Sequence, residues 1–406
     1  MNLTDRQEFI QKTWNRYPTT PSSCKGYGAV QKIEIRDDKI LLIVNNSSFE
    51  LDSKQQKYSD FKFIMKNDIV AIDENNQVQL LVPAITESSL QISIATQINW
   101  NLFIKKIKNY FNDENFIELQ TPSLVVCPGF EPSLEVFQTE FQLGSLRKTF
   151  FLPTSPELSI KKIISRLVRE KADLNVFEIA KVFRNDEVTN RHISEFFMLE
   201  WYRCFRPLDD IQKDILNLVK ILSANKVLQI EKASMKELFK KHLDFDLTPQ
   251  TTFVDLKTLA DKLKIDYRHI DDFDDLFNLL FIEKIEFQWP KEKLFFLEKY
   301  PPSQAALARV DNEGWAERFE FYWQGYEIAN AFHELNDPVI QQERIIKDLE
   351  LKKKYGKKQI PSDEKFIEAL EYGLPPTSGV ALGLERLFMA LNNCSEIQNV
   401  HYLSKL

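Results

Sequence analysis

The chain has few cysteines, few glycines and no long apolar run. Its four cysteines, Cys24, Cys127, Cys204 and Cys394, are scattered, without a CxxC pair or another metal-binding spacing. This usage argues against a zinc site and is expected in a reducing compartment. No stretch approaches the roughly 18 consecutive apolar residues of a membrane-spanning helix, and the polar start carries no secretory signal. We therefore expect a cytoplasmic protein.

The chain also lacks an excess of basic residues. It has 53 Lys and Arg against 60 Asp and Glu, a formal net charge of −7. A protein that binds nucleic acid without specificity usually has a net positive charge, so the composition argues against this class. Hydrophobic residues make up 43% of the 406 residues and aromatic residues 12%, which is enough for a large core. The length favours two domains or more.

The first 95 residues have the pattern of a small β-rich module. A capping-box sequence predicts a short helix over about 4–16. Asp37-Asp38 and Glu74-Asn75-Asn76 are hairpin turn signals between strand-like segments. The expected strands are 32–36, 39–44, 68–72 and 77–82. We predict a β-rich and possibly OB-like module over 1–90, followed by a junction at 83–96.

After residue 95 the spacing of the apolar residues changes from that of strands to that of a helix. Apolar residues recur at helical spacing over 98–111, and a strand follows that stops at Pro122. Further strands are expected at 149–152, 176–184, 194–205, 318–324 and 326–333, and mainly helix at 207–299 and 338–372. Strands that run together, with helices grouped elsewhere, predict an α+β domain with an antiparallel sheet over 95–406.

The expected strand 194–205 carries a carboxylate among apolar residues. Side chains alternate along a strand, so Phe196, Met198, Glu200 and Tyr202 share one face. A carboxylate on an apolar face is costly unless a cation or a hydrogen-bond donor meets it. Glu200 and Tyr202 could form a pocket for the ammonium group of a substrate. Alternatively, Glu200 pairs with an internal Arg or Lys.

The loop before this strand is rich in cations. Arg184, Arg191 and His192 are suited to phosphate oxygens, although a solvated charged loop would have the same composition. At the other end of the chain, Arg386 falls in the first turn of a helix that follows a short strand between Gly379 and Gly383. A helix N-terminus favours anions, so this position is either an anion site or an ordinary helix surface.

Two further segments offer carboxylates. Glu320 and Glu327 lie on opposite arms of a probable hairpin with Gln324-Gly325 at its tip. Paired carboxylates beside a polyphosphate commonly hold Mg²⁺, whereas cross-strand pairing with cations is the alternative. Ser155 is a natural N-cap for a helix that starts after it, and Glu157 would be a favourable carboxylate in the first turn of that helix.

Together and in this order, the motifs resemble those of the class II aminoacyl-tRNA synthetases. The helix and strand that end at Pro122 resemble motif 1, FRNDE and RHISEF resemble motif 2, and GVALGLER resembles motif 3. TSPEL, EFFMLEWY and EIANAFHELND are similar to the lysine branch. Within it, the chain most resembles the freestanding paralogues that modify a lysine of elongation factor P. The resemblance covers about residues 95–406.

The resemblance implies roles for these residues. Arg184 and Arg386 would be catalytic, gripping the α- and γ-phosphates of ATP. ATP would contact Arg184, Asn185, Asp186, His192, Phe196, Glu320 and Arg386. The amino acid would contact Ser155, Glu157, Glu200, Tyr202, Asn330, Glu334 and Ala381. Glu320 and Glu327 would hold Mg²⁺.

The implied function is ATP-dependent activation of (R)-β-lysine or lysine, and transfer to a lysine side chain of elongation factor P, by a homodimer. Ala381 stands where lysyl-tRNA synthetases have a glycine, which favours β-lysine. A compact lysine–tRNA ligase is the alternative, and an inactive paralogue with a regulatory binding role is a second one. The chain departs from the family pattern at Asp186, Ile193-Ser194 and Glu385, and in its N-terminal module.

Overall fold

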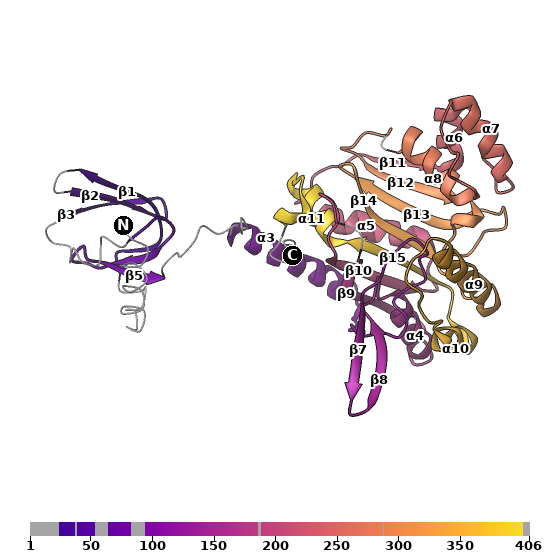
Figure 1. Cartoon of the computed structure of the whole chain (residues 1–406), viewed down its shortest axis with the longest axis horizontal. Helices are drawn as coiled ribbons and strands as arrows, with labels where there is room; N and C mark the ends of the chain where they lie inside the picture. Colours follow the sequence, from indigo (N-terminus) through magenta and orange to yellow (C-terminus); the bar gives the residue numbers. More distant parts are fainter. Residues whose placement is uncertain are drawn as a thin grey trace. The chain divides into compact units, whose positions relative to one another are not determined.

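The computed structural model describes residues 24–36, 39–52, 64–82, 94–185, 188–286 and 288–400 (Figure 1). The helix predicted at 4–16 and most of the predicted junction lie outside these ranges. The contacts within the chain divide it into two units, Met1–Gln91 and Ile92–Leu406. None of the described helices combines the length and the apolar content that crossing a membrane requires.

The first unit contains a five-stranded antiparallel sheet with the strand order β3-β2-β1-β4-β5. Its strands are β1 (Gly26–Arg36), β2 (Lys39–Val44), β3 (Ser47–Asp52), β4 (Ile69–Ile72) and β5 (Val78–Val82). Val30, Leu42 and Val70 are fully buried between them. Both predicted strand pairs are present, so the β-rich prediction is confirmed. Five antiparallel strands are compatible with an OB-like fold, which stays a prediction.

The second unit is built on an eight-stranded sheet with the order β11-β12-β13-β14-β15-β10-β9-β6. Its strands are β6 (Ile117–Glu118), β9 (Asn175–Phe183), β10 (Glu195–Cys204), β11 (Ile230–Ser234), β12 (Leu294–Tyr300), β13 (Ala316–Trp323), β14 (Tyr326–His333) and β15 (Thr377–Gly383). The central pairs are antiparallel, as predicted, but the pairs β11–β12 and β6–β9 at the two edges are parallel. A parallel pair requires a long crossover, and the helices between β11 and β12 supply one.

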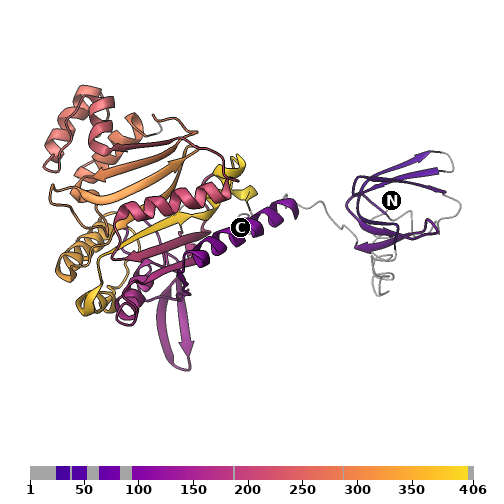
Figure 2. The same cartoon turned by 180° about the vertical axis from the view of Figure 1, so that it is seen from behind.

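Helices cover this sheet on both sides. They are α3 (Ile94–Asp113), α4 (Glu157–Leu167), α5 (Leu208–Leu222), α6 (Met235–Leu243), α7 (Phe253–Leu263), α8 (Phe273–Lys284), α9 (Pro338–Lys354), α10 (Glu364–Gly373) and α11 (Leu384–Asn392). The view from behind shows α3 and α5 crossing one face of the sheet (Figure 2). Under them the rings of Phe111 and Phe177 stack at 4.7 Å, next to the fully buried Trp201. The opposite face is apolar under α6, α7 and α8, where Phe295, Leu297 and Tyr322 pack, and it carries buried polar side chains such as Glu200 on β10.

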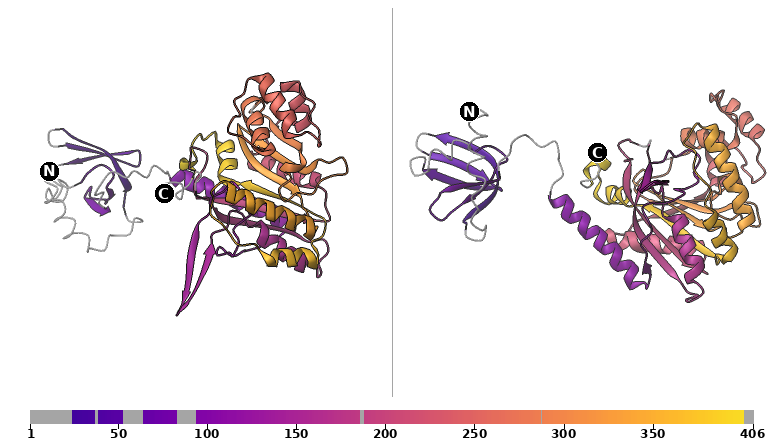
Figure 3. Two further views of the ribbon diagram at one scale, coloured as in Figure 1. Left: turned by 45° about the vertical axis from the view of Figure 1, so that its right-hand side comes forward. Right: turned by 60° about the horizontal axis from the view of Figure 1, so that its bottom comes forward.

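Two local predictions were incomplete or wrong. After the strand that stops at Pro122, only 149–152 was expected before α4, but β7 (Gln138–Leu143) and β8 (Leu146–Phe151) form a hairpin that extends away from the sheet (Figure 3). All residues of β7 are exposed, so no alternation of burial marks the strand. Ser155 is not the N-cap of α4. The helix begins at Glu157, and the cap position is Pro156, without a side-chain hydrogen bond.

Candidate active site

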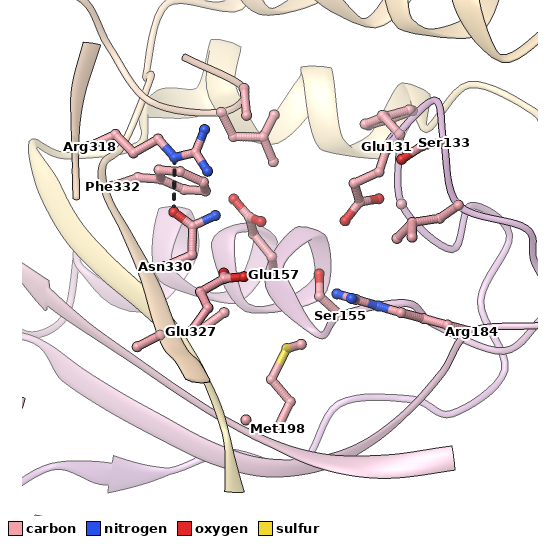
Figure 4. A pocket seen from close by; sticks show the side chains of 18 of the residues that line it. Glu131, Ser133, Ser155, Glu157, Arg184, Met198, Arg318, Glu327, Asn330 and Phe332 are labelled. Atoms are coloured by element: carbon pink, nitrogen blue, oxygen red, sulfur yellow. Dashed lines mark hydrogen bonds between the residues drawn. The ribbon is translucent and has the colours of Figure 1, made fainter. Parts of the chain in front are cut away.

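A cavity of about 630 Å³ opens on the face of the eight-stranded sheet opposite α3 and α5. Strands β10, β14 and β15, helix α4 and the loop before β10 all contribute to its wall. Most residues predicted from the sequence line it: Ser155, Glu157, Arg184, His192, Phe196, Glu200, Tyr202, Glu327, Asn330, Glu334, Ala381 and Arg386. Figure 4 shows Glu157, Glu327 and Asn330 facing into this space, with Ser155 and Arg184 beside them.

The register of the sheet brings distant residues together. Glu200 pairs with Ala381 across β10 and β15, and Ala381 pairs with Asn330 across β15 and β14. The three residues thus form one row across the sheet floor. Ala381 also packs against the small apolar cluster of Ala180, Val182 and Met198, so it contributes both to the core and to the cavity wall. The Nε of Arg318 donates to Asn330 Oδ1 at 3.0 Å and fixes the end of this row (Figure 4).

The floor of the cavity is rich in carboxylates. Glu200 is only 1% exposed, its Oε2 accepts a hydrogen bond of 2.8 Å from Tyr202, and its Oε1 receives none from the described residues. Burial raises the pKa of Glu200 well above its ordinary value, and the charges of Glu157 and Glu334 add to this effect. Burial likewise raises the pKa of Glu334 to about 8. A cationic group of a ligand could therefore bind these carboxyl groups in their ionised form.

A buried cation that the sequence reasoning missed lies in the same cluster. The Nζ of Lys161 is 2.5 Å from Glu157 Oε1 and 2.5 Å from Glu334 Oε2. Burial alone would lower the pKa of Lys161, but the two carboxylates raise it above its ordinary value. The i,i+4 spacing from Glu157 was the available signal. The internal cation expected as an alternative partner of Glu200 thus exists, but it binds the two neighbouring carboxylates.

The other end of the cavity is cationic. Arg386, in the first turn of α11, donates from Nη1 to the carbonyl of Glu327 at 3.0 Å, and its Nη2 contacts His192 Nε2. The guanidinium of Arg184 lies 5.3 Å from the ring centroid of Phe196. Arg191 turns toward the hairpin tip, where it donates to the carbonyl of Gly325 at 3.3 Å. Two arginines and a histidine on one wall make a site for phosphate groups.

Of the paired carboxylates expected to hold a metal, only Glu327 lines the cavity. Glu320 accepts hydrogen bonds from Arg318 and, at 2.5 Å, from Tyr322. Burial raises the pKa of Glu327 to about 7, and the charge of Glu320 adds to this, whereas Arg386 and other cations oppose it. The described residues contain no cluster of three or more metal-binding side chains. A metal ion here would therefore need oxygens from a ligand.

Two of the predicted ATP contacts, Asn185 and Glu320, are not in the cavity wall, and one departure from the family pattern has a structural role. Asn185 is exposed, and its backbone N–H donates to the carbonyl of Glu135 at 3.1 Å. Asp186 lies outside the described residues. Glu385 is 1% exposed and accepts the backbone N–H of Phe197 at 2.9 and 3.1 Å, which ties α11 to β10.

Comparison with known proteins places this geometry in a family. Residues 92–406 match the model of the class II tRNA synthetases of the D, K and N type. Similar curated proteins carry the name elongation factor P–(R)-β-lysine ligase. The protein of Haemophilus influenzae is 36% identical over 309 residues, which is 73% of this chain and 91% of the relative. Those of Hamiltonella defensa and Edwardsiella ictaluri are 33% and 34% identical, with the same coverage.

The match explains why these motifs meet in one cavity. The expectations of a class II fold and of a likeness to the freestanding lysine-branch paralogues are both confirmed, since the family model spans the whole second unit and the relatives carry that name. The chain belongs to the class II aminoacyl-tRNA synthetase family.

Proposed function

We propose that the chain is an ATP-dependent ligase that activates (R)-β-lysine as its adenylate and transfers it to a lysine side chain of elongation factor P. The names of the relatives support the reaction and the acceptor. The observation that carries the proposal for this chain is the charge of the cavity floor. That floor calls for a ligand with two cationic groups.

The charge balance is direct. Three carboxylates, Glu157, Glu200 and Glu334, face one ammonium, Lys161, so two negative charges remain when all four groups are ionised. A diamino acid supplies two ammonium groups. Such a ligand would replace the protons that Glu200 and Glu334, with their raised pKa values, otherwise retain. A ligand with one ammonium group, or with none, would leave one or both of these carboxyl groups protonated and without a cationic partner.

The cationic wall suits the activation step. The carboxylate of the amino acid attacks the α-phosphorus of ATP, an O–P bond forms, and the bond to pyrophosphate breaks. Arg184 would bind the α-phosphate and Arg386 the γ-phosphate, with His192 near the outer phosphates and Phe196 against the adenine. Catalysis then comes mainly from positioning and from neutralised charge.

The carboxylate chemistry also fits Mg²⁺. Glu327 would hold the ion together with phosphate oxygens, and Glu320 would be a second ligand after its carboxylate turns from Arg318. A bound Mg²⁺ would neutralise phosphate charge. In the transfer step, the acceptor amine attacks the acyl carbonyl, an amide forms, and AMP leaves while the amine loses a proton. Because translation factors act in the cytoplasm, we place the chain there.

A homodimer is part of the proposal. Exposed apolar side chains occur on α3 (Ile98 and Leu102), on the edge strand β6 (Ile117) and just after it (Leu124 and Val126). This is the segment that resembles motif 1. Apolar side chains beside an unpaired strand edge are typical of an interface. A two-fold contact between copies would cover them.

A compact lysine–tRNA ligase is the second candidate, favoured by the additional five-stranded unit. The experiment measures ATP–pyrophosphate exchange with (R)-β-lysine and with α-lysine, and then transfer of the labelled amino acid to elongation factor P or to tRNA. We expect exchange with (R)-β-lysine and label on elongation factor P. Label on tRNA alone would favour the second candidate, and no exchange with either amino acid would refute both.

A further inference from the structure

Lys161 joins two parts of the fold at the cavity floor. Its side chain is 0% exposed, which is rare for a lysine. Glu157 lies one turn earlier on α4, whereas Glu334 directly follows β14, on a different layer of the unit. A buried ammonium between two carboxylates therefore fixes the position of the helix relative to the sheet.

Lys161 contacts one oxygen of each of the two carboxylates. Its Nζ forms ion pairs with Oε1 of Glu157 and with Oε2 of Glu334. The other oxygen of Glu334, Oε1, lies against Gly379, where a Cβ atom would be only 2.5 Å away. Both glutamates line the cavity. Each carboxylate thus contacts Lys161 through one oxygen, while its residue also lines the cavity.

We propose that Lys161 is a positioning residue, an internal counter-ion that orients Glu157 and Glu334 and sets the preference of the cavity for a ligand with two ammonium groups. The identity of that ligand as a diamino acid rests on the proposed function. Lys161 itself touches neither the substrate nor ATP in this scheme. It acts through the two carboxylates.

The electrostatic consequence has a definite sign. The carboxylates whose charges interact with that of Lys161 are Glu157 on α4, Glu200 on β10 and Glu334 after β14. The positive charge of Lys161 lowers the pKa values of Glu334 and Glu200, against the larger effect of burial. Removal of this charge should raise the pKa values of both carboxyl groups. Because an ammonium group binds the ionised carboxylate, binding of the diamino acid then requires a higher pH.

The test compares two neighbouring lysines on one helix. Lys161→Met keeps the apolar stem and removes the charge. Lys162→Met is the matched control, since Lys162 pairs with Asp363 at 2.5 Å, is 28% exposed and does not line the cavity. The readout is ATP–pyrophosphate exchange with (R)-β-lysine over a range of pH, with separate KM values for the diamino acid and for ATP.

For Lys161→Met we expect KM for the diamino acid to rise about tenfold to a hundredfold, as for loss of a buried charge partner. The KM for ATP should not change, and the acidic limb of the pH profile should move to higher pH. Lys162→Met should behave as the wild type. Unchanged KM and pH profile in Lys161→Met would overturn the inference.

A second variant, Lys161→Arg, tests the inference if Lys161→Met does not fold. Lys161→Arg retains the buried charge, so its acidic limb should stay at the wild-type position even where the larger side chain raises KM. A limb displaced to higher pH in Lys161→Arg would overturn the inference. Absence of exchange in the wild type would refute the proposed function instead, so the two failures are distinguishable.

Discussion

Substitution of Gly379 by alanine tests the geometry of the cavity floor most directly. Gly379 pairs with Tyr202 across β15 and β10. A Cβ atom at this position would lie 2.3 Å from Cε1 and 2.4 Å from Cδ1 of Tyr202, and 2.5 Å from Oε1 of Glu334. Carbon atoms in contact prefer about 3.5–4.0 Å, so the tyrosine ring must move by roughly 1 Å. Only glycine fits here, for reasons of space.

The displacement has two costs. Overpacking of a rigid site costs about 1–3 kcal/mol of unfolding free energy. Movement of the ring also breaks the 2.8 Å hydrogen bond from Tyr202 to Glu200, and a hydrogen bond to a charged group contributes about 1.5–3 kcal/mol. At about 1.4 kcal/mol per factor of ten, kcat/KM for the diamino acid should fall roughly 10- to 150-fold. The KM for ATP should not change, because the phosphate wall lies on other residues.

The assay is ATP–pyrophosphate exchange at varied diamino acid and varied ATP, together with thermal unfolding. Gly144→Asn is the control, since nothing lies within 4 Å of a Cβ atom there. Asparagine also tolerates its backbone angle, φ of +59°. The reasoning is refuted if Gly379→Ala retains wild-type kcat/KM for the diamino acid and wild-type stability.

Four further outcomes are expected. Arg184→Ala and Arg386→Ala should each lower the rate of pyrophosphate exchange by about 10²–10³ without a loss of fold, and near-normal exchange would contradict the phosphate assignment. The wild type should prefer (R)-β-lysine over α-lysine by roughly 10–200-fold, and Ala381→Gly should narrow this gap by improving α-lysine; a wild-type preference for α-lysine would reverse the substrate assignment. Because burial raises the pKa of Glu334 to about 8, its carboxyl is protonated below that pH and loses its affinity for ammonium. KM for the diamino acid should therefore rise as the pH falls through about 8, and a flat profile would exclude this residue from the subsite. Leu102→Asp should convert a dimer into monomers in light scattering, whereas a wild-type monomer would refute the homodimer.

The local patterns of the sequence predicted most of the candidate site. Period-2 alternation was sufficient to place Glu200 and Tyr202 on one face of β10, because side-chain direction in a strand is set by the backbone alone. Gln324 and Gly325, both with positive φ, form the predicted hairpin turn for the same local reason. The start of α11 before Arg386 was also readable, since Gly379 and Gly383 mark the short strand before it.

Other features depend on packing between distant segments. The sequence determined that the chain would place carboxylates and cations on strands and on a helix start, because these positions follow from local periodicity. It did not determine that Lys161 would bind Glu334, which is far away along the chain. The partner of a buried charge is the group that the fold brings to it. Only the tertiary structure decides that pairing, because desolvation makes the pairing obligatory without specifying the partner.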